Sequence, residues 1–284
     1  MKARWGYLLL IPLALSGFLL FGSQLVFLKQ SFYQDLAFGK TAAEWTFGNY
    51  IKIATDSYYL RTLWLTTYIS FIVAIVCMGL GFPIAKVLAR LQSRWTTFLL
   101  GTIVLTSFIT TVIQIFGLII IFRADGPVNR LLLFLGLSHE PLRLVGTAGG
   151  VIVGLIYASF GFAVMLMYGI VRTIPESLDD AAAIHGATKT RILTRIILPL
   201  SLPGLIVGFL TIFNLSMGAF TSAALLGGGR IITLPVLIQR TMLIDVKYGM
   251  AGALAAMLLL FVIVLNLVSV MILKRFRATR GITV

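Results

Sequence analysis

Hydrophobic positions in this chain form long, uninterrupted blocks rather than the alternation of apolar and polar residues that water-soluble helices and strands show. Each block exceeds 20 residues and is followed by a stretch that carries charges. A bilayer core of about 30 Å is crossed by about 20 helical residues, so every block is long enough to span it. The pattern predicts six transmembrane helices, at residues 6–28, 62–85, 96–122, 144–171, 200–226 and 248–273.

Composition agrees with a membrane protein and excludes a soluble enzyme. Hydrophobic residues make up 59% of the chain and charged residues 11%, whereas soluble domains average roughly 45–50% apolar and about 25% charged residues. No segment between the predicted spans is long enough to form a separate soluble domain. We therefore expect residues 1–284 to form one all-α, polytopic membrane domain.

The net charge of +14 would suit a nucleic-acid-binding protein, in which basic patches neutralise phosphates. Here, however, the basic residues lie between apolar spans, and short cytoplasmic loops of membrane proteins are enriched in Lys and Arg. The distribution predicts cytoplasmic N- and C-termini and no nucleic-acid partner. The basic-rich segments are 1–5, 86–95, 172–199 and 274–284, and the poorer ones are 29–61, 123–143 and 227–247.

Three basic residues recur at every fourth position in the loop between the second and third predicted spans. They are Lys86, Arg90 and Arg94, a spacing that places them on one helical face. Basic residues next to a membrane are attracted to anionic lipid headgroups. We interpret this stripe as an orientation anchor.

Two groups of residues within the spans are candidates for a translocation path. Asn214, Ser216 and Thr221 are polar, and polar side chains at membrane depth face protein or water rather than lipid. They either line a path or join neighbouring helices. Aromatic residues of the fourth predicted span offer ring faces to a cation or simply pack in the core: they are Tyr157, Phe160, Phe162 and Tyr168. The sequence leaves both alternatives open for each group.

The sequence offers no candidate catalytic or metal site. The Gly-Lys-Thr run at 39–41 resembles the end of a phosphate-binding loop, but Gln34 stands where the leading glycine is required. The His-Glu pair at 139–140 begins a zinc-protease pattern whose second histidine position holds Arg143. We therefore expect a protein that is not an enzyme and holds no cofactor of its own.

The segment 172–199 predicts two short helices. A capping box at 177–180 can begin the first helix, alanines continue it, and Gly186 ends it. Thr188 can cap the second helix, and Pro199 ends it as the next span begins. The small side chains of the first helix suit insertion into a groove of another protein, although an amphipathic loop on the membrane surface would have a similar composition.

Within this segment a spaced motif stands out. Asp180-Ala181-Ala182 is followed by three residues, Gly186, nine residues and Ile196-Ile197-Leu198-Pro199. The run resembles the EAA loop of ATP-binding-cassette (ABC) importer permeases, in which E-A-A, three residues, G and nine residues precede I-x-L-P. The spacing matches throughout. The departure is Asp180, where the family usually has Glu, which keeps the charge on a shorter side chain.

The resemblance implies the transmembrane subunit of a type I ABC importer in a bacterial inner membrane, with the permease fold of that family. Its EAA loop would form a coupling helix in a cleft of a cytoplasmic ATPase. The implied partners are two ATPase subunits that hold ATP and Mg²⁺, a second permease forming a heterodimer, and an extracytoplasmic substrate-binding protein. The residues carried over are Asp180, Ala181, Ala182, Gly186, Ile196, Leu198 and Pro199.

Secondary matches are most similar to the spermidine/putrescine-type branch of these permeases. They are Asn49-Tyr50, the Gly-Pro-Val-Asn run at 126–129, and Leu198-Pro199-Leu200 leading to Pro203-Gly204. The implied solute is a polyamine-like organic cation. Ferric-iron, opine and phosphonate permeases share much of this layout, and no predicted span contains a carboxylate that would bind a polycation. A permease for another solute is therefore the alternative.

A different class, the ion-coupled secondary transporter, would carry charged residues within the spans and often an inverted repeat. No Asp, Glu, Lys or Arg lies deep in a predicted span. The sequence accordingly favours an ABC permease over this class.

Overall fold

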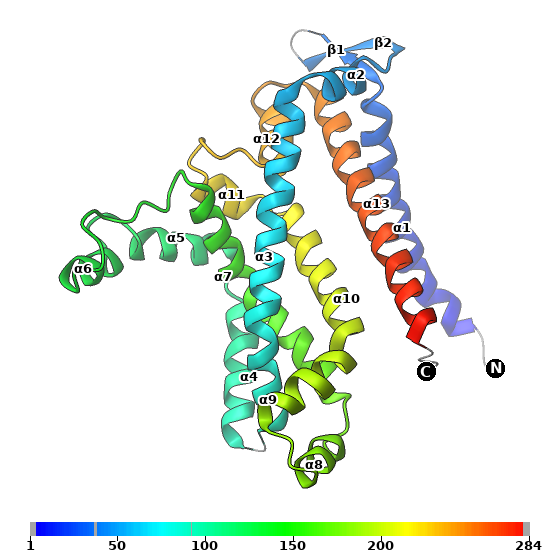
Figure 1. Cartoon of the computed structure of the whole chain (residues 1–284). Helices are drawn as coiled ribbons and strands as arrows, with labels where there is room; N and C mark the ends of the chain where they lie inside the picture. Colours follow the sequence, from blue (N-terminus) through cyan, green and yellow to red (C-terminus); the bar gives the residue numbers. More distant parts are fainter. Residues whose placement is uncertain (1–3, 37–38, 92, 281–284) are drawn as a thin grey trace. The chain divides into compact units, whose positions relative to one another are not determined.

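The computed structural model describes residues 4–36, 39–91 and 93–280, and the side chains from 12 to 271 apart from 37, 38, 92 and 107 (Figure 1). Residues 1–3 and 281–284, which belong to the terminal segments assigned to the cytoplasm by charge, lie outside this description. In chain order the elements are α1 (Arg4–Gln30), β1 (Tyr33–Asp35), β2 (Thr41–Trp45), α2 (Gly48–Thr55), α3 (Ser57–Arg90), α4 (Arg94–Ser107), α5 (Thr111–Ile121), α6 (Pro127–Phe134), α7 (Ala148–Arg172), α8 (Ser177–Ile184), α9 (Lys189–Ile192), a π-helical turn (Leu193–Ile197), α10 (Leu198–Met217), α11 (Thr221–Leu226), α12 (Leu234–Leu243) and α13 (Tyr248–Arg280).

The predicted all-α polytopic fold is confirmed. Within the described ranges, strand occurs in one antiparallel hairpin, in which Tyr33 of β1 lies opposite Trp45 of β2. Among the residues that the structure describes, five helical segments are long and apolar enough to cross a membrane, and the bent pair α4–α5 would make a sixth. The five are α1, α3, α7, the continuous run from α9 through α10, and α13.

The expected span 96–122 consists of two helices rather than one. α4 and α5 meet at an angle of 98° across the break between Ser107 and Thr111. A break in a helix frees backbone carbonyls, which need new donors when water is absent. The side-chain amide of Gln114 supplies them, because its Nε2 donates to the carbonyls of Thr106 (3.0 Å) and Ile109 (3.2 Å).

The expected span 200–226 is also divided differently. α10 ends at Met217 and a turn separates it from α11. At the other end Pro199 does not end a helix, since α9, the π turn and α10 are continuous. A proline inside a helix clashes with the carbonyl four residues earlier. The wider π turn precedes it, and the Leu198 N–H donates to the carbonyl of Leu193, five residues back.

The chain divides into two compact units. The first comprises residues 1–63 and 234–265, and its hairpin is fixed to the start of α13. Both carboxylate oxygens of Asp35 accept hydrogen bonds from the first turn of α13, at the Gly249 N–H (2.7 Å) and the Met250 N–H (2.8 Å). The Asn49 amide donates to the carbonyls of Ser31 and Tyr33. These bonds fix the described part of segment 29–61 to the start of α13.

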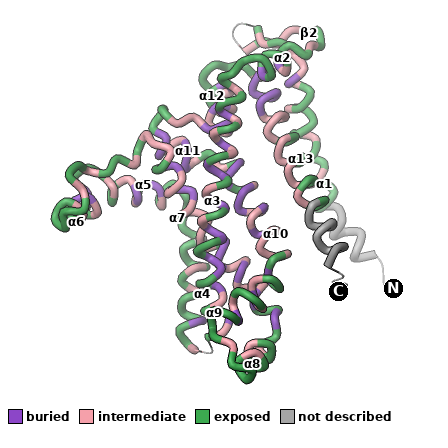
Figure 2. Tube along the Cα trace, viewed as in Figure 1, coloured by how far each residue is buried: buried purple, intermediate pink, exposed green. Residues whose placement is uncertain are grey.

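The second unit comprises residues 64–233 and 266–284, and its core lies between α3, α7 and α10. α3 turns a continuous buried face inward, seen as the purple stretch of that helix in Figure 2, which includes Val73, Ala74, Cys77 and Ala85. Gly208 of α10 allows a close approach, because an added Cβ would lie 2.7 Å from the methyl groups of Met78 and Met167. Small residues at such crossings permit tight helix packing.

Candidate functional site

The helix α8 begins in a way that the sequence did not predict. Ser177 is its first helical residue rather than its cap, and no side chain caps the helix. The carbonyls of Pro175 and Glu176 instead accept from the N–H groups of Leu178 and Asp179. The expected capping box therefore does not form, and Asp180 stays near the positive end of the helix dipole, a favourable place for a carboxylate.

The other end of α8 forms as predicted. Gly186 has a φ of +74°, a left-handed conformation that glycine adopts without steric cost. Its N–H donates to the carbonyl of Ala183, and the Ala187 N–H donates to that of Ala182. These two bonds are those of a Schellman motif. The predicted stop at Gly186 is confirmed. α8 is a rigid helix of eight residues, and the carbonyls of its last turn are bonded by the Schellman motif.

None of the residues of α8 is buried in this chain, as the green and pink tube shows at this end of the unit (Figure 2). Asp180 and Ala181 are exposed, Ala182 is half-buried, and the Ile184 side chain is 84% exposed. Ile184 was not among the expected site residues, although it is the more exposed of the two large apolar side chains of α8. An exposed apolar surface on a rigid helix is suited to contact with another protein.

The return segment is a helix that continues into the membrane span. Thr188 caps α9 as predicted, since its hydroxyl accepts from the Arg191 N–H at 3.3 Å. Ile196 lies in the π turn and is half-buried, as is Leu198 at the start of α10, while Pro199 is exposed. The structure therefore brings the seven motif residues onto α8, its cap and the helix that follows.

A cluster of charges that the sequence did not predict joins α8 to the end of α3. The Arg90 Nε donates to Asp179 Oδ2 at 2.9 Å, and its Nη1 donates to the carbonyl of Ile174 at 3.0 Å. Arg172 contacts Glu176 at 3.4 Å and donates to the carbonyl of Ala89 at 3.2 Å. We interpreted Arg90 from sequence as a lipid anchor, but in the folded chain it binds the segment that precedes and begins α8.

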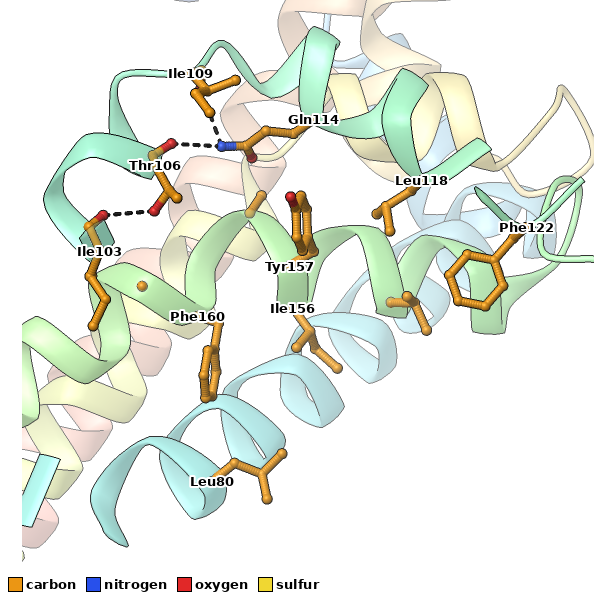
Figure 3. Close-up of a pocket in the computed structure, with 13 residues that line it drawn as sticks. Leu80, Ile103, Thr106, Ile109, Gln114, Leu118, Phe122, Ile156, Tyr157 and Phe160 are labelled. Carbon is orange, nitrogen blue, oxygen red and sulfur yellow. Dashed lines mark hydrogen bonds between the residues drawn. The ribbon is translucent and has the colours of Figure 1, made fainter. Parts of the chain in front are cut away.

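The path candidates Tyr157 and Phe160 line a pocket of about 560 Å³ in the second unit. Figure 3 shows both rings directed toward this pocket from α7, with Leu80 of α3, Ile103 of α4 and Leu118 of α5 around it. The lining side chains include the amide of Gln114 and the hydroxyl of Thr106, and no charged group. The pocket offers aromatic faces and a few dipoles.

The polar path candidates lie elsewhere. The side-chain amides of Asn214 and Asn266 exchange hydrogen bonds of 3.1 and 3.2 Å, which satisfies both groups between helices. Ser216 is buried, with no hydrogen-bond partner for its Oγ among the described residues. Thr221 is the first residue of α11. None of the three lines the pocket that holds Tyr157.

Within the described ranges, no group of three or more His, Cys, Asp or Glu side chains is arranged to hold a metal ion. The described residues thus form a short exposed helix, α8, and a pocket whose lining side chains are uncharged.

Comparison with known proteins gives one family match over residues 78–278, which is more than half of the chain. The family is described as the binding-protein-dependent transport system inner membrane component. The spermidine/putrescine transport system permease protein PotB of Escherichia coli (strain K12) is 34% identical over 185 residues, which cover 65% of this chain and 67% of the relative. PotB of Haemophilus influenzae is 29% identical over 208 residues, covering 73% and 72%.

Among solved structures, this chain is similar to a chain of a bacterial alginate ABC transporter in complex with an alginate pentasaccharide-bound periplasmic protein. The TM-score is 0.80 and the match covers 97% of this chain and 96% of the other. The sequence identity is 18%. The similarity therefore concerns the fold alone.

Proposed function

The chain belongs to the family of binding-protein-dependent transport system inner membrane components, the permease subunits of ABC importers, and from this premise we propose that α8 docks in a groove of a partner ATPase. The exposure of α8 carries the proposal. A helix of eight residues with none buried, small side chains and Ile184 84% exposed leaves its apolar surface for another molecule to cover. The Lys and Arg distribution supports a cytoplasmic position for this helix.

Transport then follows from a difference in contacts between two states. Two ATPase subunits would bind ATP with Mg²⁺ and hydrolyse it, so the chain itself needs no catalytic group or cofactor. Their closure displaces the grooves, and α8, held rigid by its Gly186 cap, transmits that displacement to the bundle. A ligand shifts a two-state equilibrium only by its differential affinity for the states. A second permease and an extracytoplasmic binding protein complete the importer.

For the solute we propose a polyamine-like organic cation. The names of the PotB relatives support this class. The rings of Tyr157 and Phe160 could face such a cation, and the lack of charged groups in their pocket would keep binding weak enough for release. Asn214 and Ser216 serve helix contacts in this proposal, and Thr221 begins α11.

Reconstitution tests the proposal. The permease would be expressed with the other subunits of its importer, purified, and placed in proteoliposomes that contain ATP. We expect the ATPase to co-purify and radiolabelled spermidine to enter only when its binding protein and ATP are present. A chain that purifies without an ATPase and moves solute down an ion gradient would overturn the coupling role. ATP-driven uptake of another solute, with spermidine excluded, would overturn the polyamine assignment alone.

A further inference from the structure

The end of α3 and the start of α8 are joined by one guanidinium group at the same end of the second unit (Figure 1). We propose that Arg90 is the positioning residue that links α8 to α3, so that a displacement of α8 reaches the bundle through this side chain. The inference rests on the proposed coupling role of α8. It assigns a function to a residue outside the EAA motif.

The contacts of Arg90 hold the segment at three points. Its Nε donates to Asp179 at 2.9 Å, its Nη1 donates to the Ile174 carbonyl at 3.0 Å, and Nη1 lies 3.7 Å from Glu176. The Arg90 and Asp179 side chains are only 16% and 21% exposed. A planar, permanently charged fork makes several bonds with fixed relative directions. The link is thus shielded from solvent and directional.

A second arginine contacts the same junction. Arg172, the last residue of α7, donates to the Ala89 carbonyl at 3.2 Å and contacts Glu176 at 3.4 Å. Its side chain is 52% exposed, and exposed ion pairs contribute little. Arg90 is therefore the stronger of the two links.

The helix that Arg90 terminates is part of the core. Leu88 and Ala89 beside it are buried. Further along α3, Gly81 lies against Val164 of α7, and the ring of Phe71 meets that of Phe209 of α10 edge to face. Close-packed interiors transmit a displacement rather than absorb it. A displacement of the end of α3 is therefore transmitted to α7 and α10.

Without Arg90, the Arg172–Ala89 hydrogen bond would remain as the weaker link to α3, and α8 would be joined to α10 through the chain itself. That route runs through the Gly186 turn and the Thr188 cap into α9 and α10. A displacement of α8 would then act more strongly on α10 than on α3. The function inferred for Arg90 is to make the helices on both sides of α8 move together.

The test compares Arg90→Gln with Arg94→Gln in the complete importer. Arg94 belonged to the basic stripe expected from sequence, but the structure places it at the start of α4, after α3 has ended. Its side chain is exposed and forms no ion pair among the described residues. We would measure radiolabelled spermidine uptake per ATP hydrolysed, and the stimulation of ATPase activity by loaded binding protein. Because coupling between sites typically changes equilibria about 5–150-fold, we expect Arg90→Gln to lower both about tenfold, with basal ATPase activity and assembly retained. Arg94→Gln should match the wild type.

A double-mutant cycle adds a readout that a merely structural role would not produce. If Arg90 acts through Asp179, combining Arg90→Gln with Asp179→Asn should lower coupling no further than the worse single substitution. Losses that multiply would show that the two residues act independently and would overturn the inference. Wild-type coupling in Arg90→Gln would overturn it as well.

Two outcomes separate this inference from the function on which it rests. A wild-type complex without an associated ATPase contradicts the proposed function, whereas a coupled wild type with an equally coupled Arg90→Gln contradicts only the role of Arg90. If Arg90→Gln does not assemble, the same measurements are made on Arg90→Lys, which keeps the charge but lacks the planar fork whose separate nitrogens bond Asp179 and Ile174. If neither variant assembles while Arg94→Gln does, Arg90 is required for folding, and the inference is overturned.

Discussion

At the scale of single residues, the backbone conformation at position 186 favours glycine, whereas the space around it would admit a side chain. Its φ is +74° and no atom lies within 4 Å of an added Cβ. A side chain in this conformation strains the turn by about 1–3 kcal/mol. Arginine at 186 would also place a long charged group on the surface that we propose enters the ATPase. We expect Gly186→Arg to reduce ATPase co-purification and solute uptake at least ~tenfold, the size of an interface contact of about 1.4 kcal/mol.

The chain offers a matched control in Gly136. It follows α6 in the same Schellman geometry, with the Leu137 N–H bonded to the Leu132 carbonyl, a φ of +66° and open space around an added Cβ. Gly136→Arg carries the same strain and the same charge on a loop that we expect to lie outside the cell. It should assemble and transport normally. Equal behaviour of the two variants would contradict docking at Gly186.

The site residues differ in how far the sequence could predict them. Gly186 and Thr188 act on neighbours within five residues, so spacing alone was enough to assign a helix stop and a cap. Arg90 and Asp179 are 89 positions apart. The sequence placed Lys86, Arg90 and Arg94 on one face but held no information on which of them another segment would reach. That pairing depends on packing of α3 against the rest of the unit.

At the scale of secondary-structure elements, α13 begins at a cap provided by a distant strand. Asp35 accepts two backbone hydrogen bonds at its first turn, where the helix dipole favours a negative charge. Removing such a cap costs about 1–2 kcal/mol. We expect Asp35→Ala to lower the thermal unfolding midpoint of the detergent-solubilised protein by a few degrees.

Asp125→Ala is the control for this measurement. Asp125 pairs with Arg123 at 3.3 Å, but both side chains are more than 60% exposed, and exposed ion pairs contribute about 0–1 kcal/mol. Its midpoint should stay close to that of the wild type. An Asp35→Ala midpoint no lower than that of Asp125→Ala would argue against the capping role.

Helices were easier to predict than their interruptions. Among the described residues, five of the six apolar blocks contain a helix long enough to span a membrane, and the sixth corresponds to the bent pair α4–α5. Such blocks can be recognised because the requirement for about 20 apolar residues acts on each segment alone. The break between α4 and α5 depends instead on Gln114 reaching two freed carbonyls. Continuity across Pro199 depends on the π turn that precedes it. The hairpin β1–β2 is held by Asn49 and Asp35, contacts that a hydrophobicity pattern does not contain.

At the scale of the whole molecule, solute movement would depend on weak contacts along the route. Cation–π contacts at open sites are worth about 0.5–1 kcal/mol, or roughly two- to fivefold in affinity. If the pocket beside Tyr157 meets an organic cation, Tyr157→Ala should raise the half-saturating concentration for spermidine uptake by this factor. ATP hydrolysis per transported molecule should not change, because α8 and its contacts are unaltered.

Phe162→Ala serves as the control for the pocket. Phe162 is an aromatic residue on the same helix, is 47% exposed and does not line the pocket. Its removal should leave spermidine uptake near the wild-type value. Equal shifts for Tyr157→Ala and Phe162→Ala would indicate a general effect on α7 and would exclude a specific role for the pocket.

The π turn at Leu193–Ile197 has a consequence for engineered chimeras. One extra residue in a turn offsets everything beyond it by about 100° relative to an unbroken α-helix. This single turn therefore sets the direction in which the inner loop, residues 172–199, faces relative to α10. When loops are exchanged between related permeases, residues 172–199 should be grafted as one piece. A junction that replaced the π turn with an α-helical turn would rotate the grafted α8 away from the ATPase that it should contact.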